Sequence, residues 1–149
     1  MRFIRNGMDV HVKEMMKKQV VSIDGALTIK DAAKIMEDSG VSCLIITENN
    51  TPVGIVTERD FVTRITSSGK PSSTQVRKVM SILLISIGLE DSAKKLAELI
   101  KEKNIHKIPV VEANKLVGIV SATDLIRKCI INSDLEMRQI CNSFAQMAF

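Results

Sequence analysis

The sequence contains two copies of one pattern, separated by 64 residues. Gly-Ile-Val-Thr-Glu-Arg-Asp at residues 54–60 is matched by Gly-Ile-Val-Ser-Ala-Thr-Asp at residues 118–124. The same shift pairs like residues elsewhere without a gap: Val12 with Val76, Met16 with Met80, Ile23 with Ile87, Ala33 with Ala97, and Asn50 with Asn114. A constant offset over most of a chain indicates a tandem duplication, so we expect two copies of one small fold.

Length and composition fit this arrangement. The chain has 149 residues, and a half of about 60 residues is only marginally stable alone, so the halves should share a core. The content of 45% hydrophobic and 26% charged residues is typical of a globular protein. The longest apolar run, residues 82–85, is far shorter than the roughly 18 residues of a membrane span. The N-terminus lacks the apolar core of a signal peptide, and we expect a cytoplasmic protein.

The cysteines are Cys43, Cys129 and Cys141, an odd number without C-x-x-C spacing. In a cytosolic protein this pattern favours thiols, and we interpret all three as small buried hydrophobic residues. The two histidines, His11 and His106, do not stand in ligand spacing with the cysteines, so no metal site is expected.

The net charge of +4 mildly favours anionic partners, but the lysines are scattered over predicted helix faces. The chain has no Trp or Tyr and only four Phe, so it lacks the side chains on which single-stranded nucleic acids stack. Nucleic acid is therefore not the expected partner.

Each copy predicts the same order of elements. A helical turn at residues 12–16 or 76–80 precedes a strand at 20–23 or 84–87. A helix follows, with apolar residues at i, i+3, i+4 and i+7: Ile29, Ala32, Ala33 and Met36, then Ala93, Leu96, Ala97 and Ile100.

The ends of these two helices are marked by capping residues. Thr28 and Ser92 are natural N-caps, and Thr28-x-x-Asp31 approximates a capping box. Gly40 and Asn104 stand where each helix should end, and both residue types tolerate a left-handed backbone.

A hairpin and a closing helix complete each copy. The predicted strands are residues 43–47 and 52–56, then 107–111 and 116–120, joined by Asn-containing turns. The closing helices begin at Glu58 and Ala122, and their inward-facing residues are predicted to be Phe61, Val62 and Ile65, then Leu125, Ile126 and Cys129.

The chain accordingly divides into five segments. They are an N-terminal arm (1–11), a first repeat (12–66), a Ser/Gly/Pro linker (67–75), a second repeat (76–131) and a C-terminal amphipathic helix (132–149). The apolar stripe of the last helix could cover the protein's own core, swap to a partner chain or dock a target, and own-core or dimer contact is favoured.

A tandem β-α-β-β-α unit that ends in Gly-hydrophobic-x-Ser/Thr-x-x-Asp resembles the cystathionine-β-synthase (CBS) domain pair, or Bateman module. The resemblance covers roughly residues 12–131. It implies an α/β fold with two repeats related by pseudo-two-fold symmetry, in a stand-alone member of the family. Such pairs are regulatory, bind adenosine compounds and commonly dimerise into a disc of four repeats. It therefore implies AMP, ADP or ATP as ligand, with NAD or S-adenosylmethionine as alternatives.

The resemblance also assigns roles to the motif that occurs twice. Asp60 and Asp124 would accept hydrogen bonds from the ribose hydroxyls, since an ionised carboxylate can accept two at once. Thr57 and Ser121, with the N–H groups of the helix N-terminus, would bind phosphate. Gly54 and Gly118, which open the two motifs, would let the backbone come close where a Cβ would intrude.

The two pockets implied by the resemblance differ in basic residues. His106-Lys107 matches a basic pair that reaches the phosphates in the γ subunit of AMP-activated protein kinase, with Lys in place of Arg. The main pocket would be formed by Val20, Val21, Val41, Ser42, Cys43, His106, Lys107, Ser121 and Asp124, with backbone groups of Val41 and Cys43 reading the adenine edge. The second would be formed by Thr57, Arg59, Asp60, Ile85 and Ile105. The second pocket lacks a basic pair like His106-Lys107, although Arg59 could substitute for it. This pocket is therefore expected to be weak or empty.

Both motif copies also fit a purely structural interpretation. Thr57-x-x-Asp60 and Ser121-x-x-Asp124 have the spacing of ordinary capping boxes, in which the acid returns to the N-cap amide. A lone histidine such as His106 is commonly a surface or hydrogen-bonded residue.

Nothing in the sequence resembles an activated nucleophile, a general acid–base pair or a Walker loop, so an enzyme is not expected. The leading hypothesis is a non-catalytic, adenosine-nucleotide-binding energy sensor whose ligand-dependent shape is read by a second subunit or an unidentified protein target. The alternatives are a nucleic-acid-associated protein and a purely structural dimerisation scaffold.

Overall fold

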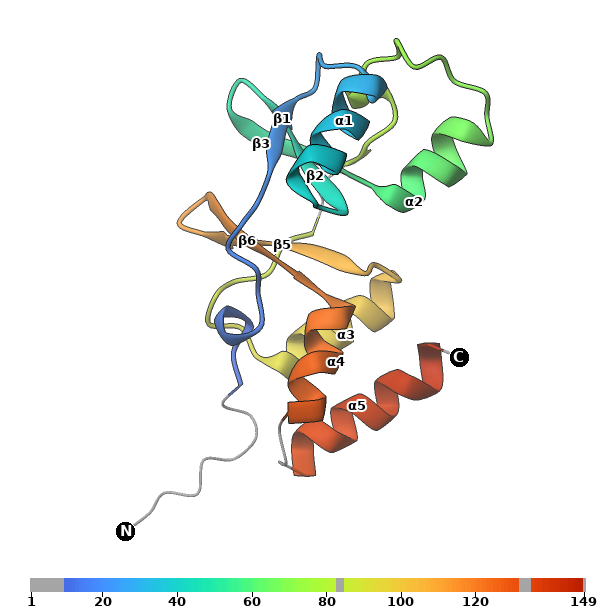
Figure 1. Ribbon diagram of the computed structural model, residues 1–149. Coiled ribbons are helices and arrows are strands. Elements are labelled where there is room, and N and C mark those ends of the chain that lie inside the picture. Colours follow the sequence, from blue (N-terminus) through green and yellow to red (C-terminus); the bar gives the residue numbers. More distant parts are fainter. Residues whose placement is uncertain (1–9, 83–84, 132–134, 149) are drawn as a thin grey trace. The chain divides into compact units, whose positions relative to one another are not determined.

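The computed structural model describes residues 10–82, 85–131 and 135–148 (Figure 1). Most of the predicted N-terminal arm, the start of the predicted strand 84–87 and residues 132–134 lie outside these ranges. The described residues form two compact units. The first-repeat unit consists of residues from 20–84, and the second-repeat unit combines residues from 1–19 with residues from 85–149.

The first-repeat unit contains a four-stranded sheet with the order β1-β2-β3-β4. β1 is parallel to β2, whereas β2–β3 and β3–β4 are antiparallel. The strands are β1 (Ser22–Asp24), β2 (Cys43–Glu48), β3 (Thr51–Thr57) and β4 (Ser81–Ile82). The predicted hairpin is confirmed, and Asn49 and Asn50 supply the positive φ angles that its turn requires.

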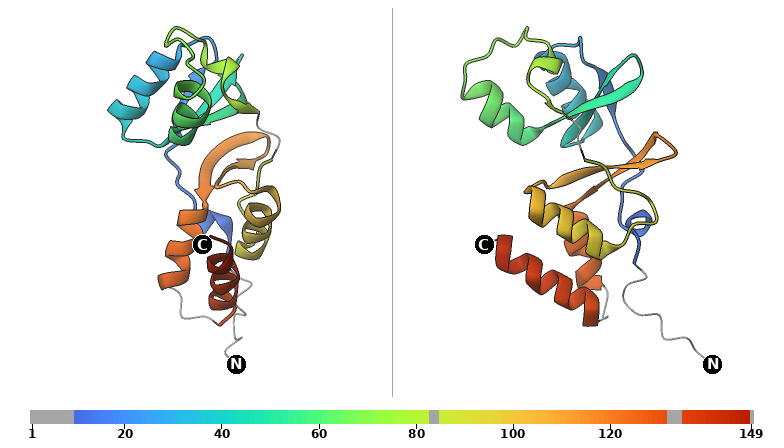
Figure 2. Two further views of the ribbon diagram at one scale, coloured as in Figure 1. Left: turned by 90° about the vertical axis from the view of Figure 1, so that its right-hand side faces the viewer. Right: turned by 180° about the vertical axis from the view of Figure 1, so that it is seen from behind.

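Helices cover one face of this sheet (Figure 2). They are α1 (Ile29–Ser39) and α2 (Glu58–Asp60), which continues as the π-helical η3 (Phe61–Thr66); a 3-10 turn, η4 (Val76–Lys78), follows the linker. The core between helices and sheet contains Leu44, Ile46 and Val56, which are completely buried. About 25 cal/mol for each Å² of buried apolar surface makes such a core the main stabilising contribution.

The ends of α1 form as the sequence predicts. The Asp31 N–H donates to the Thr28 hydroxyl at 3.2 Å, and the Asp31 carboxylate accepts from the Thr28 N–H at 3.0 Å and from the Thr28 hydroxyl at 2.8 Å. These two hydrogen bonds hold the pKa of Asp31 below its ordinary value, because they favour the ionised carboxylate. The helix ends at Gly40 in the left-handed region, at φ 64°.

The second-repeat unit has the corresponding hairpin and helices, with a two-stranded sheet and an additional helix. Its elements are η2 (Val12–Glu14), α3 (Ala93–Lys103), β5 (Lys107–Glu112), β6 (Lys115–Ser121), α4 (Ala122–Ile131) and α5 (Leu135–Ala148). Ser92 caps α3 by accepting the Lys95 N–H, and Asn104 ends the helix at φ 50°, as predicted. β5 and β6 form the predicted hairpin, beside which Ile87 bridges to Val110 in parallel.

The segment that opens each sequence copy belongs to the unit of the other copy: residues 12–19 to the second-repeat unit, and residues 76–82 to the first-repeat unit. Lys17 bridges to Ile119 in the second-repeat unit, while β4 pairs with β3 in the first. The motif glycines allow this close approach. A Cβ on Gly118 would lie 2.8 Å from the Lys17 carbonyl, and one on Gly54 would collide with Met80. In the described structure these two glycines therefore make room for the chain itself.

The helix α5 covers α3 and α4 on the side away from the β5–β6 hairpin (Figures 1 and 2). Met137 and Phe144 are buried in the core that α5 shares with these helices. Cys129 on α4 and Cys141 on α5 form a disulfide. The prediction of three thiols is therefore wrong for these two residues, because a sequence does not show which helices will lie side by side.

Two predicted core residues point outward. Val62 is 66% exposed and Ile126 is 41% exposed. Phe61 and Ile65 lie one turn apart on the inner face, and so do Leu125 and Cys129. Val62 and Ile126 each come directly after an inward-facing residue, so each is rotated by about 100° onto another face of its helix. None of the helices among the described residues is both long and apolar enough to cross a membrane.

Candidate functional site

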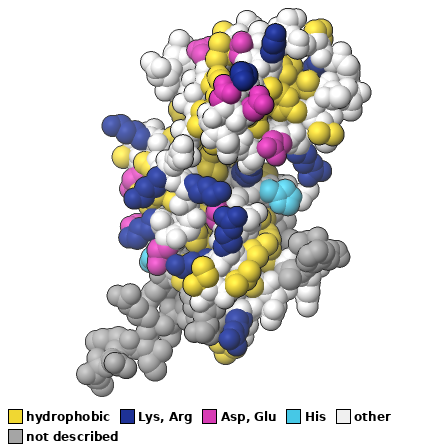
Figure 3. Space-filling model, in the orientation of Figure 1, with side chains coloured by type: hydrophobic (Ala, Val, Ile, Leu, Met, Phe, Trp, Pro, Cys, Tyr) yellow, Lys and Arg dark blue, Asp and Glu magenta, His cyan; other side chains and the backbone are white. Residues whose placement is uncertain are grey.

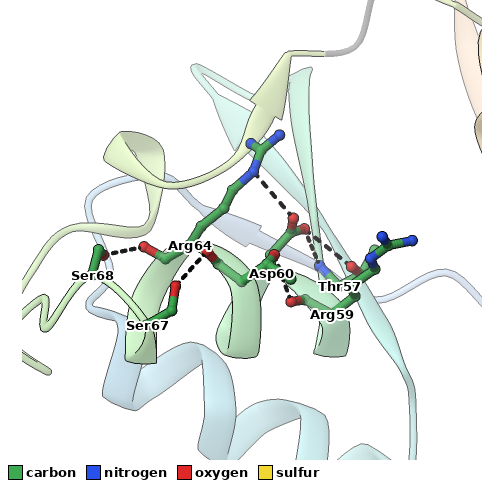
Figure 4. A network of polar contacts seen from close by, with 7 residues as sticks. Thr57, Arg59, Asp60, Arg64, Ser67 and Ser68 are labelled. Atoms are coloured by element: carbon green, nitrogen blue, oxygen red, sulfur yellow. Dashed lines mark hydrogen bonds and ion pairs between the residues drawn. The ribbon is translucent and has the colours of Figure 1, made fainter.

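The first-repeat motif places a buried acid at the start of its closing helix (Figure 4). Asp60 is only 9% exposed. Its Oδ2 accepts hydrogen bonds from the Thr57 N–H at 2.8 Å and from the Thr57 hydroxyl at 3.1 Å. Its Oδ1 lies 3.5 Å from Arg64 Nε, so both carboxylate oxygens have a partner.

The second-repeat motif has the same geometry with one difference. Asp124 is 7% exposed, and its Oδ2 accepts from the Ser121 N–H and hydroxyl, each at 2.8 Å. The Asp124 N–H donates to the Ser121 hydroxyl at 3.1 Å, which completes a capping box. Lys128 stands at the position of Arg64, but among the described residues it forms no ion pair with Asp124. One oxygen of Asp124 is thus less engaged than its counterpart in Asp60.

The polar groups assigned to phosphate are largely engaged already. Both motif hydroxyls donate to the acid three residues on, as do the N–H groups of Thr57 and Ser121. The next N–H groups, of Glu58 and Ala122, donate to the carbonyls of Ser42 and His106 at 3.1 and 2.9 Å. These first donors therefore have partners within the chain itself, and the phosphate role of Thr57 and Ser121 stays a prediction.

The apolar residues assigned to the adenine lie in the first-repeat unit. Val21 and Val41 are half-buried against its core, and Val20 is also half-buried. The Val41 N–H donates to the Met36 carbonyl at 3.2 Å, so only the carbonyl of Val41 could read an adenine edge. Cys43 opens β2 and pairs with Thr57.

The basic pair lies beside the second-repeat motif. Lys107 pairs with Ser121 across the β5–β6 hairpin and is half-buried. His106 is exposed, and its carbonyl fixes the start of α4 by accepting the Ala122 N–H. Within the described chain, no group of three or more His, Cys, Asp or Glu side chains is arranged to hold a metal ion.

The predicted site residues divide between the two units. The first-repeat unit contains Val20, Val21, Val41, Ser42, Cys43, Thr57, Arg59 and Asp60. The second-repeat unit contains Ile85, Ile105, His106, Lys107, Ser121 and Asp124. Each predicted pocket draws on both units, so its assembly stays a prediction. Arg64 was not singled out from the sequence, although its position four residues after Asp60 is the signal for a helical ion pair.

Comparison with known proteins assigns both repeats. The CBS domain family matches residues 12–67 and 76–130. The chain belongs to the CBS-domain family. The CBS domain-containing protein YhcV of Bacillus subtilis is 34% identical over 114 residues, which cover 76% of this chain and 81% of that protein.

Solved structures share the fold of this CBS pair. A hexameric CBS-CP12 protein from bloom-forming cyanobacteria is 26% identical with a TM-score of 0.73, covering 94% of this chain and 92% of that one. The CBS domain pair of protein MJ0100, in complex with 5-methylthioadenosine and S-adenosyl-L-methionine, is 24% identical with a TM-score of 0.70, covering 80% and 94%. The tandem α/β repeat fold predicted from the sequence is confirmed.

Proposed function

We propose that this CBS pair is a non-catalytic regulatory module that binds an adenosine nucleotide through Asp124. The observation that carries the proposal is the state of this carboxylate. It is buried, one oxygen is held by Ser121, and it has no ion pair with Lys128 among the described residues. A fixed, ionised carboxylate of this kind can accept hydrogen bonds from adjacent ribose hydroxyls.

The neighbouring basic residues favour a ligand that carries phosphate. Lys107 lies opposite Ser121 in the hairpin, and His106 precedes it. A lysine ammonium binds phosphate as a point charge. The MJ0100 pair was solved with two sulfur-containing adenosine compounds, which supports an adenosine ligand as a class. The basic pair leads us to propose AMP, ADP or ATP rather than an adenosine compound without phosphate.

The site built on Asp60 is proposed to be the weaker one. The Arg64 guanidinium already occupies Oδ1 of this carboxylate. A ribose would have to displace that ion pair, which is worth about 0 to 1 kcal/mol for a pair with an exposed partner. We propose that a ligand bound by residues of both units acts by favouring one arrangement of the units over others.

A thermal-shift screen tests this proposal. A ligand at about 100 times its dissociation constant adds roughly 2.7 kcal/mol of stability. We expect AMP, ADP or ATP to raise the melting temperature, and 5-methylthioadenosine or S-adenosylmethionine to raise it less. Absence of a shift with every adenosine compound would contradict ligand binding. A larger shift with 5-methylthioadenosine or S-adenosylmethionine than with the nucleotides would contradict the phosphate assignment.

A further inference from the structure

A disulfide joins the last two helices of the second-repeat unit. It links Cys129 on α4 to Cys141 on α5, with a sequence separation of 12 residues. Both cysteines are half-buried rather than enclosed in the core. Because exchange with a thiol requires access to one of the two sulfurs, a reagent in solution can reach this bond in the folded chain.

Few contacts other than this bond hold α5 in place. Met137 and Phe144 are buried in the core cluster of the unit, and Ile140 packs against it. Among the described residues α5 forms no ion pair, and its polar contact with α4 joins Cys129 Sγ to the Met137 carbonyl oxygen at 3.8 Å. A helix of 14 residues is only marginally stable alone in water. The disulfide therefore carries much of the attachment of α5.

The outer surface around α4 and α5 adds little to this attachment. Figure 3 shows hydrophobic side chains gathered where these two helices lie. Ile130, Ile131 and Leu135 are 70 to 81% exposed, so they bury little surface against α5. An element with few buried contacts opens locally at a low free energy, which makes α5 dependent on its covalent link.

The duplication shows what packing alone requires at the position of Cys129. A shift of 64 residues leads to Ile65, which is 5% exposed in the core of the first-repeat unit. An isoleucine thus meets the packing requirement at this point of the fold. In the second repeat a cysteine stands there, beside Cys141 on a helix that follows only this repeat. The cysteine pair therefore belongs to the attachment of α5 rather than to the repeat itself.

The contact with α5 also reaches the helix that carries Asp124. Leu125 directly follows this acid and is fully buried in the core cluster that includes side chains of α5. Cys129 lies about one turn further along α4. The helix α5 thus packs on the turns that follow the Ser121–Asp124 capping box.

We propose that the Cys129–Cys141 pair is a redox switch that holds or releases α5. A dithiol opens the bond in two exchanges. First, one reagent thiolate attacks a sulfur of the pair, and the other cysteine leaves as a thiolate and takes up a proton. The second reagent thiol then displaces the first cysteine, which is also protonated. The reagent becomes a disulfide, and the protein gains two electrons and two protons.

Release of α5 should loosen the turns of α4 that follow Asp124. The consequence for the ligand rests on the proposed function: a carboxylate on a well-ordered helix is preorganised for the ribose, so the disulfide form should bind nucleotide more tightly. The switch itself requires no nucleotide. Its test contains none, and failure of that test would leave ligand binding untouched.

Hydrogen exchange of the full chain, followed by mass spectrometry, tests the switch with dithiothreitol as the dithiol. We expect dithiothreitol to accelerate exchange at least about tenfold in residues 135–148 and at least about threefold in residues 125–131, because the bond no longer opposes local opening. The internal control is α1, which contains no cysteine and should exchange at an unchanged rate.

Two variants separate the bond from other effects of the reagent. Cys129→Ser with Cys141→Ser removes the bond, so α5 should exchange rapidly with and without dithiothreitol. Cys43→Ser keeps the bond and should respond to dithiothreitol as the wild type does. Circular dichroism checks that each variant is folded, and a thiol titration checks that reduction is complete.

Four results would overturn the proposal. The first is unchanged exchange of α5 after complete reduction of the wild type. The second is equal acceleration in α1, which would indicate global unfolding. The third is a response to dithiothreitol in the variant that lacks the pair. The fourth, faster exchange in α5 with unchanged exchange in α4, would separate the bond from the helix of Asp124.

Discussion

At the residue scale, two identical acids in duplicated motifs have different surroundings. Asp60 is paired with Arg64, whereas Asp124 has no such pair with Lys128 within the described chain. The duplication and the capping spacing could be predicted from the sequence because both are local patterns. The difference between the two acids could not, because an ion pair depends on side-chain conformation.

Arg64→Met should strengthen the weaker ligand site. Removal of the guanidinium frees Asp60 Oδ1, and a pair worth up to about 1 kcal/mol corresponds to an affinity gain of up to about fivefold. Isothermal titration calorimetry with AMP measures this change in affinity. Lys128→Met is the matched control, since the Lys128 side chain forms no ion pair with Asp124 among the described residues. An equal gain in affinity there would contradict this explanation.

Gly118→Ala should destabilise the chain by about 1 to 3 kcal/mol, because the new Cβ would meet the Lys17 carbonyl and Met16 Sδ, each at 2.8 Å. Urea unfolding measures the decrease in the free energy of unfolding. The double variant Gly118→Ala with Met16→Ala removes only the side-chain contact, so it should not restore stability. Wild-type stability in the single variant would show that the close approach is not needed.

At the element scale, helix ends followed from the sequence and helix partners did not. Gly40 and Asn104 end α1 and α3 in the left-handed region, as two residue types known to tolerate it should. The disulfide between α4 and α5 went unpredicted, because Cys129 and Cys141 become neighbours only after α5 folds back. The outward positions of Val62 and Ile126 were missed because both lie next to true core positions.

Gly40→Ala should cost about 1 kcal/mol, since a Cβ is unfavourable at φ 64° even though no atom lies near it. Asn104→Gly, at the equivalent position, should be neutral or slightly stabilising. Thermal denaturation of both variants measures the contrast. Equal destabilisation by the two changes would contradict a conformational origin.

The Cys129–Cys141 disulfide should contribute about 3 kcal/mol, since it closes a loop with a sequence separation of 12 residues. Addition of a reductant should lower the melting temperature of the wild-type chain. The double variant Cys129→Ser with Cys141→Ser should melt lower and no longer respond to reductant. A thiol assay that finds three reactive cysteines in the untreated, denatured chain would contradict the bond.

At the scale of the whole molecule, the duplication in the sequence accounts for most of the fold. The tandem α/β repeats and the family were predicted from the repeated motif and are confirmed. The exchange of opening segments between the units was not foreseen, because adjacency in sequence suggested that each copy keeps its own start. The residues predicted for each pocket divide between the two units. Bringing them together is a matter of packing that no local pattern encodes, so the pockets stay a prediction.

The most direct test of the central claim is calorimetric titration of AMP and ATP into the wild-type chain and the Asp124→Asn variant. The wild type should bind a nucleotide saturably. The variant should bind at least about tenfold more weakly while losing no more than about 1 kcal/mol of folding stability, because an asparagine still caps the helix. Equal binding by the two proteins would contradict the role assigned to Asp124.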